Sequence, residues 1–380
     1  MGSESSPIVS FCVPVFGTQR YLTDCLESIK KEVADFKRRL PRFIQEKGLD
    51  KTASARLAEL LSLINLASPL FELIVVDDGT QDKSDKKLFA QIIKQYTKDF
   101  LKNYSTEIKI VEHSRNLGLV EARRSAILIA RGKWCVFVDS DDEMTGDAIL
   151  NLLCTAYLFD ADIASGRAEI VCDFEESDAR EKMGYTKEKL ENMQQKCLIL
   201  HQGILEKGDI LKDFILDTGH SSFLWGKLFE TALLQTSFAD IPQCYCVMSE
   251  DFLIYFFILM HAKRYYGIEH TVYKYFIGRG VSSNKEITSL ESWNRACTSG
   301  AVFAIIFDFL AEASPSRVDE RMRNRLEAIA SQQALSNVRH LSRVIPSLKE
   351  EAYALLVEYW GEEIIEQAEA WIEEKRRNKR

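Results

Sequence analysis

The segment 134–142, Trp-Cys-Val-Phe-Val-Asp-Ser-Asp-Asp, constrains the fold of this chain more than any other. Its apolar first half predicts a strand buried on both faces, as in a parallel sheet. The strand runs directly into three carboxylates, which are costly to bury without a cation or a strong set of donors. Ligands of open α/β sheets lie at the carboxyl ends of the strands, so we expect Asp139 and Asp141 to face a divalent metal. The alternative is an acidic loop in which Asp142 or Thr145 caps the next helix.

Other segments upstream also predict buried strands, each followed by a helical pattern. Residues 8–16 are a β-branched run that ends near Pro14, and a helix is expected from Tyr21. Residues 71–82 contain a second run that ends in paired acids and a glycine, and residues 107–112 alternate as a third strand. Strands and helices that alternate in this way predict a parallel α/β sheet.

The composition excludes several classes of protein. Hydrophobic residues make up 46% of the 380 residues and charged residues 28%, as in a folded globular protein. The net charge of −8 argues against a nucleic-acid-binding protein. Nine cysteines without a regular spacing indicate reduced thiols, and the apolar stretch 252–260 is too short to span a membrane. We therefore expect a cytoplasmic protein, with at most peripheral contact of the basic tail 375–380 at the inner face of the membrane.

No Gly-x-Gly-x-x-Gly or Gly-Lys-Ser/Thr phosphate loop occurs in the chain, which disfavours dinucleotide oxidoreductases and P-loop enzymes. Arg123 and Arg124 fall in the first turns of a helix expected at 121–131, where the helix dipole disfavours cations. One of them is therefore a candidate for binding an anionic ligand, and the other is expected to face solvent. Asp78 has a neutral interpretation as well, in which local backbone groups of a turn satisfy it.

A set of sequence blocks in a fixed order resembles the family 2 glycosyltransferases. The blocks are Val-Ser-Phe-Cys-Val-Pro (9–14), the run with its paired acids (72–82), Arg-Asn-x-Gly (115–118), Ala-Arg (122–123) and Phe-Val-Asp-Ser-Asp-Asp (137–142). The resemblance is good over residues 8–165 and patchier beyond. It implies a GT-A fold, which is Rossmann-like, with a mostly parallel sheet flanked by helices, and which binds a nucleotide-diphospho-sugar.

The resemblance also implies roles for single residues. Those that would hold the donor nucleotide are Pro14, Val15, Phe16, Asp77, Asp78, Arg123, Ser140, Arg279 and Ser282, the last two in a flexible loop able to close on the diphosphate. Asp139 and Asp141 would be the metal-binding DxD motif. Carboxylate-bound Mn²⁺ or Mg²⁺ neutralises the charge that develops on a diphosphate leaving group.

The segment Ser249-Glu250-Asp251 precedes the apolar run 252–260. A capping serine with acids in the first helical turn is its structural interpretation. By resemblance it is the Glu-Asp motif that carries the catalytic base, with Asp251 favoured over Glu250. The segment 225–228 likewise resembles a Trp-x-Lys-Leu block on the acceptor side of the cleft, and the alternative is a helix start with a core tryptophan.

We expect three parts in the chain. Residues 1–238 would form the nucleotide-sugar-binding domain, with a helical insertion at 30–70. Residues 239–288 would form the acceptor-side segment, and residues 289–380 a helical C-terminal subdomain through which the chain could form a homodimer.

The expected activity is inverting, metal-dependent transfer of one hexosyl or N-acetylhexosaminyl unit from a UDP-linked donor. The acceptor would be a hydroxyl of a glycan, a lipid-linked oligosaccharide or a protein. The alternative is a non-catalytic sugar-nucleotide-binding or scaffold protein that retains the fold, against which Asp139, Asp141 and Asp251 count. A nucleotidyltransferase would show a glycine-rich loop between Ser10 and Thr18, and none is present there.

Overall fold

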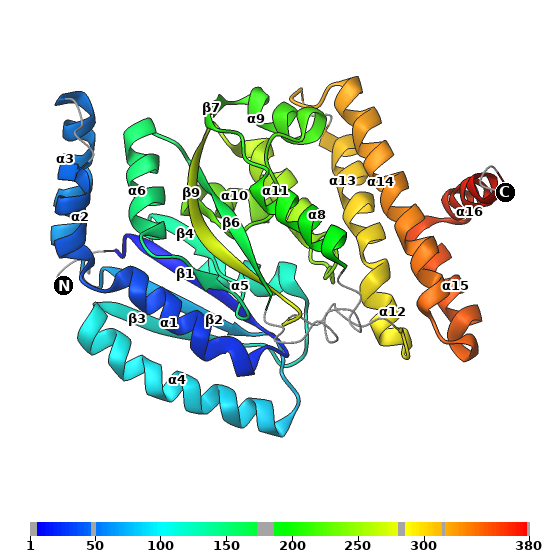
Figure 1. Ribbon diagram of the computed structural model, residues 1–380, viewed down its shortest axis with the longest axis horizontal. Coiled ribbons are helices and arrows are strands. Elements are labelled where there is room, and N and C mark those ends of the chain that lie inside the picture. Colours follow the sequence, from blue (N-terminus) through cyan, green and yellow to red (C-terminus); the bar gives the residue numbers. More distant parts are fainter. Residues whose placement is uncertain (1–5, 47–50, 173–185, 280–285, 314–315, 378–380) are drawn as a thin grey trace.

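The computed structural model describes residues 6–46, 51–172, 186–279, 286–313 and 316–377. One sheet runs through its centre with the strand order β3-β2-β1-β4-β8-β6-β9-β5, and β7 pairs with β9. Figure 1 shows helices on both faces of this sheet and a group of C-terminal helices beyond it. The predicted α/β fold class with flanking helices and a helical C-terminal region is confirmed.

The first half of the sheet is parallel throughout. Its strands are β1 (Val9–Val15), β2 (Phe71–Asp77), β3 (Thr106–Glu112) and β4 (Trp134–Phe137). Every residue of β1 and β2 is buried, because helices cover both faces of these central strands. β3 lies at the edge and is only partly buried. All the loops that follow these strands therefore meet at one edge of the sheet.

The second half of the sheet mixes both directions. β8 pairs antiparallel to β4 and β6, whereas β6 and β9 are parallel to each other. The sheet is therefore mixed, and the expectation of a mostly parallel sheet is wrong for this half. Antiparallel neighbours can be joined without a crossover helix, so strand–helix alternation does not predict them. The bounds are β5 (Glu143–Met144), β6 (Ile163–Cys172), β7 (Gly203–Glu206), β8 (Lys227–Glu230) and β9 (Arg264–Ile277).

Two hydrophobic clusters lie on the two faces of the sheet, and residues along β1 alternate between them. Phe11 and Val13 belong to one cluster, with α1 and α4, and Cys12 belongs to the other, with α5 and α11. All nine cysteines are free in the structure. The flanking helices are α1 (Leu22–Val33), α4 (Lys83–Tyr104), α5 (Leu119–Ile129), α6 (Ala148–Phe159), α8 (Lys187–Leu198), α9 (Gly208–Lys212), α10 (Thr231–Asp240) and α11 (Glu250–His261), with short turns η1 (Gln19–Tyr21) and η2 (Asp213–Asp217).

The insertion at 30–70 contains two helices, α2 (Phe36–Glu46) and α3 (Lys51–Leu66), which lie beside α6 at the left of Figure 1. A proline usually breaks a helix, yet Pro41 lies inside α2. Leu40 before the proline is buried, and Phe43 after it packs against the same core. Packing on both sides therefore holds the helix together despite the missing N–H.

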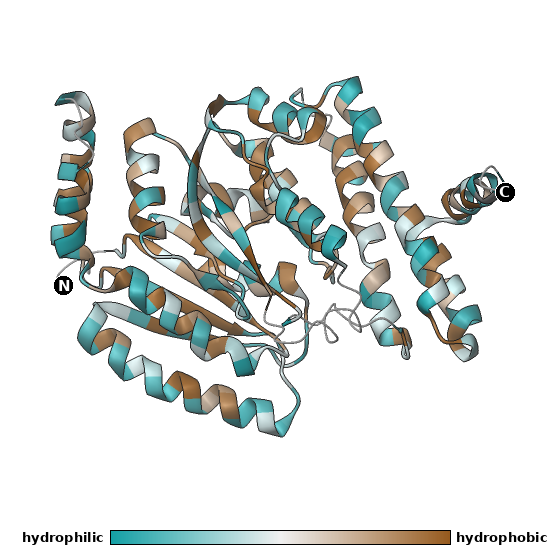
Figure 2. Ribbon diagram, viewed as in Figure 1, coloured by the Kyte–Doolittle hydropathy of each residue, from teal (hydrophilic) through white to brown (hydrophobic). Residues whose placement is uncertain are grey.

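The C-terminal helices pack against α11 through a shared hydrophobic cluster. Figure 2 shows apolar bands on α11 and α13 where the two groups of helices meet. The helical stretch Leu290–Ala313, which contains α12 and α13, is long and apolar enough to cross a membrane. However, 44% of its apolar 18-residue window is buried in the fold, and core helices of other proteins meet the same criterion. The division of the chain at residues 238 and 288 stays a prediction. The helices are α12 (Leu290–Cys297), α13 (Ser299–Ala313), α14 (Glu320–His340), α15 (Lys349–Trp360) and α16 (Glu362–Arg377), with η3 (Leu341–Arg343) and η4 (Pro346–Leu348).

Candidate active site

Three loops at the carboxyl edge of the sheet are fastened to one another by side-chain hydrogen bonds. The hydroxyl of Thr18, after β1, lies 2.6 Å from that of Ser140, after β4. The Gln19 amide donates to the Thr80 hydroxyl at 2.7 Å, and that hydroxyl donates to Asp77 at 2.6 Å. The first two predicted donor-loop residues, Pro14 and Val15, are buried within β1, and Phe16 is half-buried after it. These hydrogen bonds thus connect the loops that follow β1, β2 and β4 at this edge of the sheet.

Asp78 is saturated by donors from the loop that follows β3. Its carboxylate accepts from the backbone N–H groups of Leu117 and Gly118, both at 2.9 Å, and from the Asn116 amide at 3.0 Å. The His113 ring nitrogen lies 2.7 Å away. The donors to Asp78 therefore come from a distant loop and not from its own turn, where the Thr80 N–H donates to Asp77 instead. A role toward a ribose stays a prediction.

Asp142 anchors the acidic loop to β9. Its carboxylate accepts from the backbone N–H of Phe276 at 2.8 Å and from the Tyr273 hydroxyl at 3.0 Å. The same hydroxyl accepts from the backbone N–H of Asp139 at 3.0 Å. Tyr273 was missed by the sequence analysis, because nothing in an alternating strand marks which tyrosine meets a loop 130 residues away. Asp142 is a positioning group here rather than a helix cap.

Arg123 is the side chain at which the predicted donor-side and acceptor-side carboxylates meet. It is 1% exposed and donates to Asp251 at 2.7 Å and to Asp139 at 3.1 Å, while Glu250 lies 3.5 Å away. Arg124, its neighbour, instead donates to the Ile241 carbonyl at 2.9 Å. Of the two arginines, Arg123 therefore faces the acidic cluster.

The electrostatics of this cluster separate its two acceptor-side acids. Burial and the charge of Asp251 raise the pKa of Glu250 to about 8, although the charge of Arg123 opposes the shift. Burial also raises the pKa of Asp251, but Arg123 opposes that shift. Burial alone would lower the pKa of Arg123, yet Asp251, Asp139 and Glu250 outweigh it and raise the pKa above its usual value. Asp251 is thus better placed than Glu250 to act as an ionised base.

Asp139 and Asp141 fit a cation that arrives with a substrate. Burial and the charge of Asp139 raise the pKa of Asp141 to about 6, while the charge of Arg279 opposes the shift. Within the described residues, no group of three or more His, Cys, Asp and Glu side chains is arranged to hold a metal alone. Mg²⁺ is usually bound by one or two carboxylates together with substrate phosphates. A carboxylate pair therefore suits a metal bound with a diphosphate.

Arg279 lies beside the acidic loop, at the end of β9. It is 8% exposed, stacks on Phe276 with 3.6 Å to the ring centroid, and donates weakly to the Asp141 carbonyl at 3.4 Å. Its position suits a cation near a diphosphate. Ser282, the other residue predicted in this loop, lies outside the described residues.

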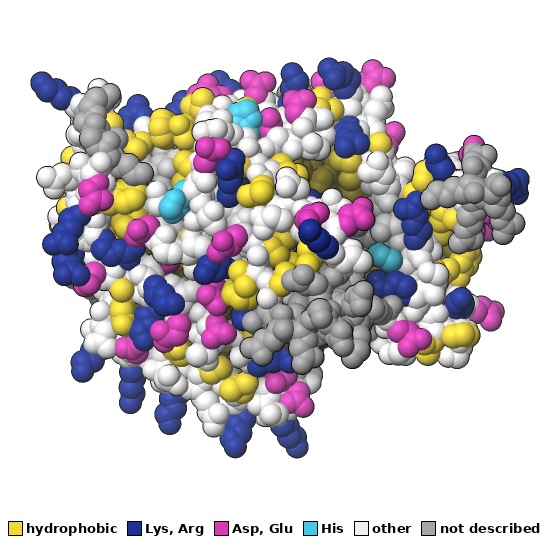
Figure 3. Space-filling model, in the orientation of Figure 1, with side chains coloured by type: hydrophobic (Ala, Val, Ile, Leu, Met, Phe, Trp, Pro, Cys, Tyr) yellow, Lys and Arg dark blue, Asp and Glu magenta, His cyan; other side chains and the backbone are white. Residues whose placement is uncertain are grey.

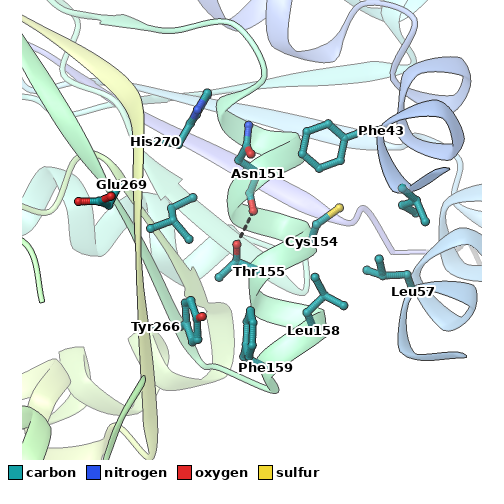
Figure 4. A pocket seen from close by; sticks show the side chains of 12 residues that line it. Phe43, Leu57, Asn151, Cys154, Thr155, Leu158, Phe159, Tyr266, Glu269 and His270 are labelled. Atoms are coloured by element: carbon teal, nitrogen blue, oxygen red, sulfur yellow. Dashed lines mark hydrogen bonds between the residues drawn. The ribbon is translucent and has the colours of Figure 1, made fainter. Parts of the chain in front are cut away.

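A separate cavity of about 510 Å³ lies between the insertion and the sheet, and Figure 4 shows its lining. Phe43 and Leu57 line it on one side, and Tyr266 and Phe159, whose rings stack at 3.7 Å, on the other. None of the predicted site residues lines this cavity. The candidate site is instead an open edge of the sheet, and on the face shown in Figure 3 acidic and basic side chains are intermixed.

Comparison with known proteins finds similarity to glycosyltransferases over part of the chain. A model of the family described as "Glycosyl transferase family 2" matches residues 53–204. The putative glycosyltransferase EpsH of Bacillus subtilis is 28% identical over 151 residues, which cover 40% of this chain and 31% of EpsH. The uncharacterized glycosyltransferase YibD of Escherichia coli is 31% identical over 108 residues, 28% of each chain. The matches thus span less than a third of the length of these relatives.

Solved structures are similar over most of the chain, at low identity. The mannosyltransferase PcManGT from Pyrobaculum calidifontis, solved with GDP-Man and Mn²⁺, has a TM-score of 0.48 at 14% identity, covering 92% of this chain and 74% of that one. Residues 1–349 of TarS from S. aureus, solved with UDP-GlcNAc, have a TM-score of 0.46 at 15% identity, covering 96% and 92%. Residues 53–204 thus match the model of the family 2 glycosyltransferases, which agrees with the resemblance of the sequence blocks.

Proposed function

We propose that this chain transfers a single sugar, with inversion, from a UDP-linked donor to a hydroxyl of a glycan, a lipid-linked oligosaccharide or a protein. The observation that carries the proposal is the meeting of Asp139 and Asp251 on one buried guanidinium, that of Arg123. These two acids are far apart in the sequence: Asp139 follows β4, and Asp251 lies in the first turn of α11. Such an arrangement places a donor-side carboxylate next to an acceptor-side one, as a displacement at a sugar carbon requires.

In this proposal the residues divide the work. Asp139 and Asp141 hold a divalent metal, which when bound neutralises the diphosphate leaving group. Arg279, from the adjacent β9 end, adds positive charge on the same side. Asp251 accepts the proton of the attacking hydroxyl, since a general base must be ionised and within hydrogen-bond reach of that proton. Arg123 fixes the direction of the Asp251 carboxylate through its 2.7 Å hydrogen bond and opposes the upward shift of the Asp251 pKa that burial causes.

A screen of nucleotide sugars by thermal shift, with and without Mn²⁺, is the first test. A ligand present at a hundred times its dissociation constant should stabilise the folded protein by about 2.7 kcal/mol. We expect UDP-linked sugars to stabilise the chain in Mn²⁺ and to lose that effect in chelator. Equal stabilisation by all nucleotides, or none by any, would remove the proposal.

Asp141→Ala tests the metal role directly. The variant should lose most of its Mn²⁺-dependent affinity for UDP, because only one carboxylate of the pair remains. Isothermal titration calorimetry of UDP in Mn²⁺ and in chelator measures this. The matched control is Asp308→Ala, which removes an exposed acid from α13. Unchanged binding of UDP by Asp141→Ala would show that the metal lies elsewhere or is not used.

Asp251→Asn tests the base and separates the proposal from a non-catalytic scaffold. The asparagine keeps the shape and one acceptor oxygen but cannot take a proton. UDP binding should stay normal while turnover, followed as UDP release, falls by roughly 10²–10⁴-fold. Glu250→Gln is the comparison, and an inactive Glu250→Gln beside an active Asp251→Asn would exchange the two roles. A wild-type protein that binds UDP-sugars but never releases UDP with any acceptor would favour the scaffold.

A further inference from the structure

Lys227, the first residue of β8, is a buried lysine whose direct partners are neutral. Its side chain is 2% exposed, and its ammonium nitrogen donates to the carbonyls of Ser221, at 3.1 Å, and Phe223. The Ser221 hydroxyl lies 3.5 Å from the same nitrogen. A buried ammonium is costly unless donors and charge are both matched. The two carbonyls match its donors, and its charge has to be matched by another group.

That charge faces the first turns of α11. The Lys227 nitrogen lies 4.9 Å from the centroid of the Tyr255 ring. Tyr255 follows Asp251 by four residues, so the two side chains lie on one face of the helix, and Asp251 points back toward the helix start. Burial lowers the pKa of Lys227 to about 7, and the charge of Asp251 opposes that shift. Arg123 and Glu250 face Asp251 from the other side, and His220 lies edge-on to Tyr255.

The loop that Lys227 holds also reaches the acidic loop after β4. Phe223 stacks on Trp225 with ring centroids 4.3 Å apart, and Trp225 stacks on Tyr273 at 4.9 Å and 3°. The Tyr273 hydroxyl holds the Asp139 backbone and the Asp142 carboxylate. Residues 221–227 therefore contact the helix that carries Asp251 through the lysine, and the donor-side carboxylate loop through a stack of three rings.

We propose that Lys227 is a positioning residue, which fixes Asp251 relative to the carboxylate loop 139–142 and supplies positive charge behind Asp251. The proposal rests on the function proposed above, in which Asp251 is the base. Lys227 itself is too deeply buried to contact a substrate. The competing interpretation is a purely structural lysine that only satisfies two loop carbonyls. The two differ in what a neutral, equally long side chain does to turnover once the protein has folded.

Lys227→Met removes the charge and keeps the length of the side chain. We expect UDP affinity in Mn²⁺ and the KM for the donor to change less than about twofold, and kcat to fall by about 10²-fold, the usual effect of a small misplacement at a reacting group. The matched control is Lys133→Met, because Lys133 also lies over an aromatic ring, 4.6 Å from the Tyr157 centroid, but far from the site. Lys133→Met should keep wild-type kcat.

Chemical rescue separates charge from structure. In Lys227→Ala, added ethylammonium should restore kcat several-fold, while ethanol of similar size should not. Wild-type kcat in Lys227→Met, or a loss in Lys227→Ala that ethylammonium does not relieve, would overturn the proposal. If Lys227→Met does not fold, Trp225→Leu tests the link from the ring stack, and wild-type kcat in that variant would likewise overturn it. A wild-type protein without UDP release would instead remove the proposed function itself.

Discussion

At the scale of single residues, the candidate site depends on charges that the fold has buried before any substrate arrives. Arg123 is surrounded by three carboxylates and has almost no contact with water. Removing one partner of such a cluster leaves uncompensated buried charge, which costs far more than the cluster contributes as a whole. Arg123 therefore holds in place three acids that would repel one another without it.

Arg123→Met should destabilise the folded protein by about 3–5 kcal/mol, because Asp139 and Asp251 would lose their shared cation. Urea denaturation at neutral pH measures this. Arg124→Met is the control at the neighbouring position, where the guanidinium binds backbone carbonyls and Glu121 rather than the cluster. Equal losses in the two variants would show that Arg123 has no special part in holding the acids.

Glu32 gives a pH dependence with a definite sign. The side chain is 1% exposed, and burial raises its pKa to about 7. The folded state then binds the proton more tightly than the unfolded state, so Glu32 lowers stability as pH rises from about 4.5 to about 7. Above that range the cost is about 3 kcal/mol and constant.

Glu32→Gln should therefore be more stable than the wild type at pH 8 and nearly equal to it at pH 4.5. The glutamine oxygen can still accept the Ile149 N–H, which now lies 3.0 Å from the carboxylate. Thermal unfolding at both pH values measures the difference. Glu46→Gln, on the exposed side of α2, should show no such pH dependence. A stability difference independent of pH would mean that Glu32 is ionised in the folded protein.

At the scale of elements, the sequence predicted most strands and helices, since their patterns are local. The strand at 107–112 and the helix at 252–260 correspond to β3 and α11. The pattern could not predict that α2 continues through Pro41, because that depends on what packs against Phe43 from elsewhere. Local signals fail where a distant contact decides the outcome.

Truncation of the last helix, α16, tests how much its C-terminal end contributes to the stability of the fold. Truncation after Glu374 removes the basic tail and no apolar residue. It loses a contact between Lys375 and the Trp371 ring at 5.4 Å and an exposed ion pair between Arg377 and Glu373 at 3.5 Å. The melting temperature should fall by less than about 2 °C. Truncation after Gly361 also removes Ile365, which is fully buried, and should lower it much further. A large drop from the short truncation would show that the tail is structural.

At the scale of the whole molecule, the sequence predicted which residues belong to the candidate site but not which of them contact one another. Carboxylates at strand ends mark Asp139 and Asp141, and an acidic pair before an apolar helix marks Asp251. The contacts of Arg123 and Tyr273 with these acids were not predictable, because the sequence around a buried residue does not show which distant residue it contacts. Lys227 left a weak signal, as a lysine at the head of an apolar strand. Homodimer formation and cellular location stay predictions.

The late position of β9 in the chain affects how the protein emerges from the ribosome. β9 lies between β6 and β5 in the sheet, and β5 has no other described partner there. Both strands are translated well before β9, and translation proceeds at about 5–20 residues per second. For several seconds the nascent chain therefore exposes an open strand edge, together with an acidic loop that β9 has not yet fastened. Synthesis order thus leaves this edge unpaired, and open to wrong strand pairing, until β9 has been made.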